Sequence, residues 1–144
     1  MRLELQMKDE RLGYVLLRLA LGVNLMMHGV SRILMGPGDF AFKLQTQFAN
    51  SMLPAAAVRV FGILLPGVEA LLGFLILIGL RTRVALVAVS LLMMVLMFGA
   101  AMIQDWSAAG TQLVYAAIVS GLIVLQRFDG WSVDVWLRRK EYGD

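Results

Sequence analysis

The 144-residue sequence contains no cysteine and only one histidine. The lack of cysteine excludes disulfides, thiol relays, iron–sulfur ligation by this chain and zinc sites of the Cys type. A single histidine also excludes a haem held by two histidines of one copy. No metal, haem or disulfide is therefore expected in this chain. Any redox reaction would take its electrons from a carrier on a partner protein.

Charged residues are scarce as well. Only 16% of the residues are charged, whereas 60% are hydrophobic and the mean hydropathy is +0.78. An ordinary soluble domain is about 45–50% apolar. The charges gather at the ends of the sequence and in short connections, which is typical of a polytopic membrane protein. The net charge of +3 therefore reports membrane topology and does not indicate nucleic-acid binding.

Four apolar segments have about the length needed to cross roughly 30 Å of hydrocarbon. They cover residues 12–34, 60–80, 84–103 and 108–125, and the fourth is the most polar at its start. We predict an all-α, integral membrane four-helix bundle that forms a single domain over residues 1–144. The first span is expected to be retained, because it is too long for the apolar region of a signal peptide and no small-residue cleavage site follows.

The link between the first two spans contains a pattern typical of a short amphipathic helix. Its apolar face comprises Ala41, Leu44, Phe48 and Met52. Asp39 is a candidate N-cap, and Pro54 ends the run. The pattern fits a helix lying on the membrane surface and a loop helix packed on the bundle equally well.

Basic residues predict the orientation. One side of a four-span bundle would carry Arg2, Lys8, Arg11, Arg81, Arg83, Arg127, Arg138, Arg139 and Lys140. The other side would carry only Arg32, Lys43 and Arg59. We therefore expect a bacterial inner-membrane protein with both termini in the cytoplasm. Trp131, Trp136 and Tyr142 would form the inner aromatic belt, and Trp106 the outer one.

The first span carries four strongly polar side chains on one stripe. At about 100° per residue from Arg18, Arg32 lies at about −40°, His28 at about −80° and Asn24 at about −120°. Gly22 and Gly29 border the stripe, where they would permit close approach of another helix. The stripe is therefore predicted to face the bundle interior.

Glu69 lies near the centre of the second span, where a carboxylate costs about 2.5–3.5 kcal/mol to insert. It shares a face with Gly62, Pro66 and Gly73. Helical side chains point back toward their own N-terminus, so His28 and Glu69 should converge while Arg18 snorkels away. We therefore predict a Glu69–His28 pair in preference to Glu69–Arg18. The cluster could alternatively serve only to fix helix register.

Several stretches resemble the DoxX family of small four-span bacterial membrane proteins. They are "LRLALGVNLMMHGVSRI" in the first span, "GVEALLGFLILIGLRTRVAL" from the second span into its turn, and "FDGWSVDVWL" in the tail. The family takes its name from a subunit of an archaeal thiosulfate:quinone oxidoreductase, and other members are associated with thiol and oxidative-stress partners. The resemblance places the family's acidic residues at Glu69 and Asp134, and puts Arg32 where lysine is more usual.

Three functions are compatible with these residues. The first is a membrane-embedded subunit of an oxidoreductase, in which His28 and Glu69 relay a proton to a quinone-like ligand. Its ligand-binding residues would be Asn24, Arg32, Gln112 and Tyr115. The second is a non-catalytic scaffold that recruits a soluble redox enzyme. The third is a small anion or lipid carrier built on Arg18 and Arg32, which would require a homo-oligomer.

Overall fold

The computed structural model describes residues 2–142, and the side chains of residues 7–141. These residues are helical apart from short connections, and no strand occurs among them. The elements are α1 (Arg2–Met35), α2 (Pro37–Gln47), α3 (Ala55–Ile78), α4 (Thr82–Met102), α5 (Trp106–Val124), the 3₁₀ turn η1 (Leu125–Phe128) and α6 (Val133–Tyr142). The side chains of Arg2 and Tyr142 lie outside the described range. Arg2 was counted among the basic residues that predict the orientation, and Tyr142 was assigned to the inner aromatic belt.

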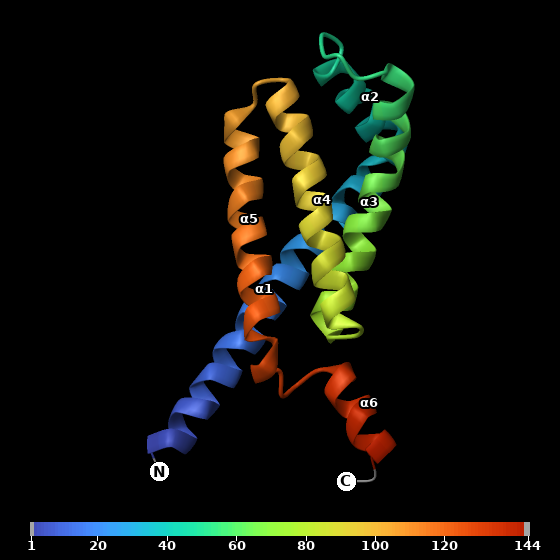
Figure 1. Cartoon of the computed structure of the whole chain (residues 1–144). Coiled ribbons are helices and arrows are strands. Elements are labelled where there is room, and N and C mark those ends of the chain that lie inside the picture. Colours follow the sequence, from blue (N-terminus) through green and yellow to red (C-terminus); the bar gives the residue numbers. More distant parts are fainter. Residues whose placement is uncertain (1, 143–144) are drawn as a thin grey trace.

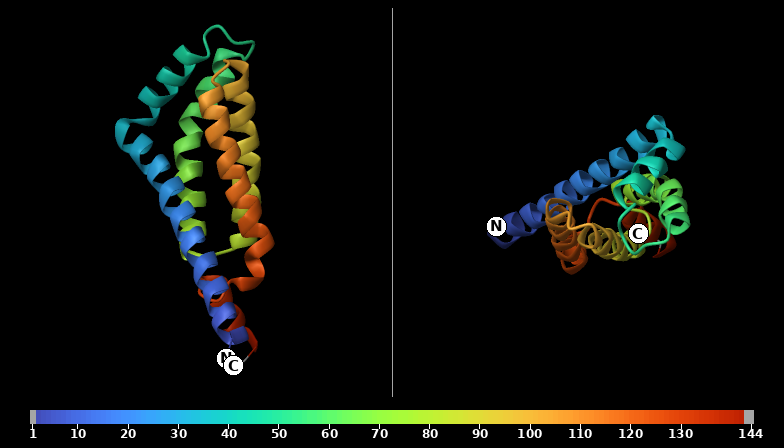
Figure 2. Two further views of the ribbon diagram at one scale, coloured as in Figure 1. Left: turned by 90° about the vertical axis from the view of Figure 1, so that its left-hand side faces the viewer. Right: turned by 90° about the horizontal axis from the view of Figure 1, so that it is seen from above.

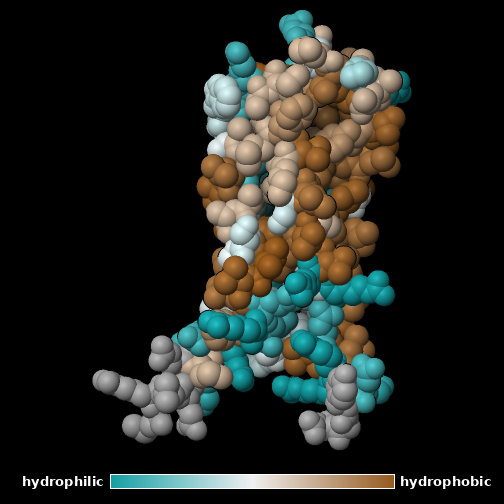
Figure 3. All heavy atoms as spheres, in the orientation of Figure 1, coloured by the Kyte–Doolittle hydropathy of each residue, from teal (hydrophilic) through white to brown (hydrophobic). Residues whose placement is uncertain are grey.

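Four of these helices are long and apolar enough to cross a membrane, namely α1, α3, α4 and α5. The predicted all-α four-span bundle, with a short helix between the first two spans, is confirmed. Figure 3 shows a broad apolar band between polar ends on the face in view. The tail helix α6 follows η1, and Figure 1 places it at the same end of the bundle as the start of α1. We call this the terminal end, and the opposite end the α2 end.

The spans are arranged as two antiparallel pairs. Helix α1 packs along α3 and α4 packs along α5, while α1 and α5 barely touch (Figure 2). A shared apolar core joins the pairs and includes Tyr14, Leu25, Ile76, Leu86 and Val119. The bundle is therefore closed between α1 and α3 but loosely packed between α1 and α5.

Glycines permit the close approach of α1 and α3. A Cβ atom added to Gly22 would lie 2.8 Å from the Leu77 Cα, and one added to Gly73 would overlap the backbone of Met26. Gly29 is similarly placed against the backbone of Ala70. The prediction that Gly22 and Gly29 permit close approach of another helix is thus confirmed, and that helix is α3.

Helix α2 packs on the bundle. Ala41 is buried against Gly62, where an added Cβ would lie 2.8 Å from the Ala41 Cα. The structure thus shows the packed arrangement. The helix begins with Pro37 after Gly36, whose φ of 104° suits glycine, so Asp39 lies in the first turn and is not the predicted N-cap. The helix also ends at Gln47, before Met52.

The tail is fixed to the terminal end by a carboxylate. Asp134 accepts hydrogen bonds from the Arg81 N–H at 2.7 Å, the Thr82 N–H at 2.8 Å and the Thr82 hydroxyl at 2.9 Å. These donors lie at the N-terminus of α4, where backbone N–H groups lack helical partners and a negative charge is favourable. The Asp134 N–H in turn donates to the Gly79 carbonyl at 3.0 Å. Helix α6 is therefore held beside the α3–α4 turn.

Candidate functional site

The buried carboxylate of α3 pairs with an arginine of α1. Glu69 is 3% exposed, and its Oε2 accepts a hydrogen bond from Arg32 Nη1 in an ion pair. The Arg32 guanidinium also lies over the ring of Phe40 in α2, 4.7 Å from its centroid. Arg32 thus joins α1, α2 and α3 near the α2 end. Sequence reasoning missed Phe40, although an aromatic ring shortly after a basic residue is a simple cation–π signal.

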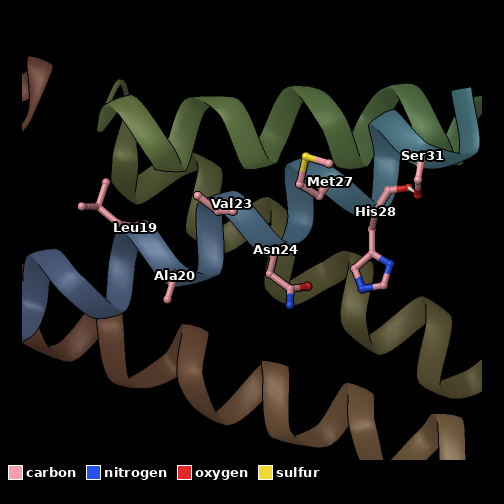
Figure 4. A pocket seen from close by; sticks show the side chains of 7 residues that line it. All are labelled: Leu19, Ala20, Val23, Asn24, Met27, His28 and Ser31. Atoms are coloured by element: carbon pink, nitrogen blue, oxygen red, sulfur yellow. Dashed lines mark hydrogen bonds between the residues drawn. The ribbon is translucent and has the colours of Figure 1, made fainter. Parts of the chain in front are cut away.

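The predicted Glu69–His28 pair is wrong as a direct contact, because Arg32 occupies that place. The reason is the angular position of the interface on α1. The side of α1 that meets α3 is centred on Gly22 and Gly29, at about +20° to +40° on the scale with Arg18 at zero. Arg32 flanks this interface, whereas His28 lies more than a quarter-turn away from it. Figure 4 shows the His28 imidazole pointing away from α3.

His28 and Asn24 line a groove on the open side of the bundle. The groove has a volume of about 740 Å³ and runs along α1 from Leu19 to Ser31. Figure 4 shows both polar side chains on the same side of α1, facing α4 and α5. A neighbouring hollow of about 380 Å³ lies between α1 and α5 and shares Ala20 and Asn24 with it. The site is thus an elongated, mainly apolar groove with two adjacent polar side chains.

Tyr115 of α5 closes part of this site. Its hydroxyl donates to the Asn24 Oδ1 at 2.8 Å, which links α5 to α1 across the hollow. With its carbonyl oxygen engaged in this way, the Asn24 amide has its N–H donors left for another group. Two of the four residues that the sequence suggested as ligand-binding groups, Asn24 and Tyr115, are therefore brought together.

Gln112 lies on the same helix but is not among the residues that line the groove. Its Oε1 is buried and has no hydrogen-bond partner among the described residues. Thr111, one residue earlier, lines the hollow in its place. The structure therefore groups Asn24, His28 and Tyr115, places Arg32 and Glu69 in a separate ion pair, and leaves Gln112 apart from both.

Arg18 does not snorkel to the membrane surface as predicted. It is 2% exposed and donates to the carbonyls of Ile76 at 2.7 Å, Leu77 at 2.9 Å and Trp131 at 2.7 Å. The first two carbonyls lie at the end of α3, where helical carbonyls lack partners and a cation is favourable. Arg18 therefore joins α1 to the end of α3 and to the tail.

The chain matches the model of a known family. The family is described as Methylamine utilisation protein MauE, and the match covers residues 10–114. This range includes Asn24, His28, Arg32 and Glu69, and it ends just before Tyr115. No curated protein and no solved structure matches the chain. The match covers most of the sequence, including most of α1 and all of α2 to α4, so the chain belongs to the MauE family of small multi-span membrane proteins.

Proposed function

We propose that this protein is a membrane subunit of an oxidoreductase system, and that the groove along α1 takes up a quinone-like ligand from the bilayer. The observation that carries the proposal is the groove itself, an open and mainly apolar face of α1 on which Asn24 and His28 lie one helical turn apart. A ligand with a polar head and an apolar body suits such a lining. The open side between α1 and α5 gives lipid-soluble molecules lateral access.

The chemistry of the two polar groups fits a quinone head group. Reduction of a quinone requires hydrogen-bond donors at its carbonyl oxygens and a source of protons. The Asn24 amide, oriented by Tyr115, would donate to one carbonyl. His28 would donate to the other and supply a proton, because an imidazole ring nitrogen can both donate a hydrogen bond and transfer its proton. Electrons would come from a partner protein.

Glu69 has a modified role in this proposal. Its carboxylate is held by Arg32, so a relay from Glu69 to His28 needs a bridging group between them. We assign the role of direct proton donor to His28. Glu69 then positions Arg32 at the α2 end. The family description and the resemblance to DoxX both support a place in a redox system. The excess of basic residues at the terminal end supports a cytoplasmic location for that end and an inner-membrane protein.

Mass spectrometry of the organic extract of the purified protein tests this function. Wild type would be compared with His28→Ala and with Ser120→Ala, a control at an exposed position of α5 that does not line the groove. We expect a near-stoichiometric quinone in wild type and in the control, and its loss from His28→Ala. Wild-type protein that carries no quinone, and binds none when a short-chain quinone is added, would contradict the proposal.

The ion pair favours a second candidate, a non-catalytic scaffold. Arg32 and Glu69 satisfy each other within the chain and join the two closely packed helices α1 and α3. Such a pair can fix helix register without any ligand. In that case Glu69→Gln would weaken folding and recruitment of a partner together, with no separate loss of quinone binding. The carrier hypothesis has less support, because Arg18 and Arg32 are both engaged inside the bundle.

A further inference from the structure

A second groove lies at the terminal end, far from the quinone proposal and independent of it. It has a volume of about 370 Å³ and is formed between the last residue of α3 and the segment from Gly130 to Arg139. Its lining includes apolar side chains, namely Ile78, Val133 and Val135, and one cation, Arg139. The groove therefore combines an apolar wall with a single positive charge.

The depth of this groove matches the boundary of the bilayer. Ile78 is the final residue of the apolar helix α3, and the polar turn to α4 follows at once. Trp131 and Trp136 both line the groove, and they are 71% and 60% exposed. Tryptophan is enriched at the level of lipid headgroups, where one part of the ring contacts hydrocarbon and another contacts water. A molecule in this groove would therefore lie at the headgroup level.

The charge around the groove favours an anionic occupant. Six basic residues belong to the α3–α4 turn, the start of α4, η1 and α6, namely Arg81, Arg83, Arg127, Arg138, Arg139 and Lys140. Among the described side chains of residues 79–84 and 125–141 three are acidic, namely Asp129, Asp134 and Glu141. One of these, Asp134, already accepts three hydrogen bonds from the start of α4. Figure 3 shows the polar surface of this end directly below the apolar band.

The groove is also built before any ligand arrives. Arg18 holds the Trp131 carbonyl and Asp134 holds the start of α4, so the tail segment is fixed on both sides of Ser132. A preorganised segment loses less conformational freedom when it binds a ligand. We propose that this groove binds one anionic phospholipid of the surrounding bilayer, with its phosphate at Arg139 and an acyl chain along Ile78 and Val135.

Native mass spectrometry tests this proposal on the full chain. The protein in detergent would be offered an equal mixture of phosphatidylglycerol and phosphatidylcholine with identical acyl chains. We expect phosphatidylglycerol to be retained in excess, and Arg139→Gln to lower that excess about fivefold, which is the effect of one cation near an anionic lipid. Arg127→Gln is the matched control, because it removes the same charge from the same end without changing the groove lining.

Three results would overturn the proposal. The first is equal retention of the two lipids by wild type. The second is an equal effect of Arg127→Gln and Arg139→Gln, which would indicate a diffuse charge effect without a site. The third is displacement of bound phosphatidylglycerol by millimolar glycerol phosphate, which would show that the apolar wall contributes nothing. Circular dichroism of each variant establishes that it is folded, and the exposed position of Arg139 makes unfolding of that variant unexpected.

Discussion

Glu69 and Arg32 differ in burial, and this difference predicts an asymmetric response to mutation. The Glu69 side chain is 4% exposed and the Arg32 side chain is 27% exposed. Arg32→Gln leaves a buried carboxylate without its partner, which typically destabilises a protein by about 3–5 kcal/mol. Glu69→Gln leaves a cation that can reach the polar boundary at the α2 end, so we expect a cost of only about 1–2 kcal/mol.

The double variant should be no less stable than Arg32→Gln alone, because it buries no unpaired charge. The free energy of coupling between the two positions should therefore be at least about 1–2 kcal/mol, which is the cost of Glu69→Gln that the double variant no longer adds. Reversible unfolding in mixed micelles, followed by tryptophan fluorescence, would measure all four proteins of the cycle. Arg59→Gln is the control, since Arg59 is an exposed cation of α3. Equal costs for the two single variants, or additive costs in the double variant, would refute the reasoning.

Three further changes follow from single contacts. Gly79→Ala should destabilise the fold by about 1–3 kcal/mol, because φ is 71° there and the new Cβ would crowd the tail. Gly67→Ala is the control and should not destabilise the fold, because Gly67 lies within a helix and faces open space. Unfolding in micelles measures both variants. Asp134→Asn removes the negative charge at the start of α4 and should cost about 1–2 kcal/mol in the same assay. Tyr115→Phe frees Asn24 and should weaken binding of a short-chain quinone about two- to tenfold by calorimetry, and unchanged affinity would contradict the assigned role.

The fold was predictable because the length of an apolar segment and the residues of a turn each determine structure from the local sequence alone. Four runs of membrane length, interrupted by Gly36, Gly79 and an acidic turn, specify four spans and their order. Small residues on α1 and α3 also predicted close approach of another helix, and in the structure these two helices approach each other. Helix α6 was not predicted, because its ten residues are too polar and too few to give an independent helical signal.

The partners inside the bundle were less predictable, since they depend on the rotation of one helix relative to another. The polar stripe of α1, about a third of the circumference wide, was predicted to face the bundle interior, and it does so only in part. Arg18 is buried and Arg32 is partly buried, whereas Asn24 and His28 are exposed. In the structure the stripe divides, with Arg18 and Arg32 beside α3 and with Asn24 and His28 facing the groove. Helical angles alone predicted the polar stripe. To predict which of its residues face α3 and which face the groove, one must also know that the α1–α3 interface is centred on Gly22 and Gly29.

The contacts of Arg18 have a consequence for the order of assembly in the membrane. Its three carbonyl acceptors lie 58, 59 and 113 residues later in the chain. During synthesis α1 therefore enters the bilayer with a cation whose partners do not yet exist, and α3 supplies the first two acceptors before the tail supplies the third. The first helix reaches its final environment only after nearly the whole chain has been made, so the last segment synthesised completes the insertion of the first.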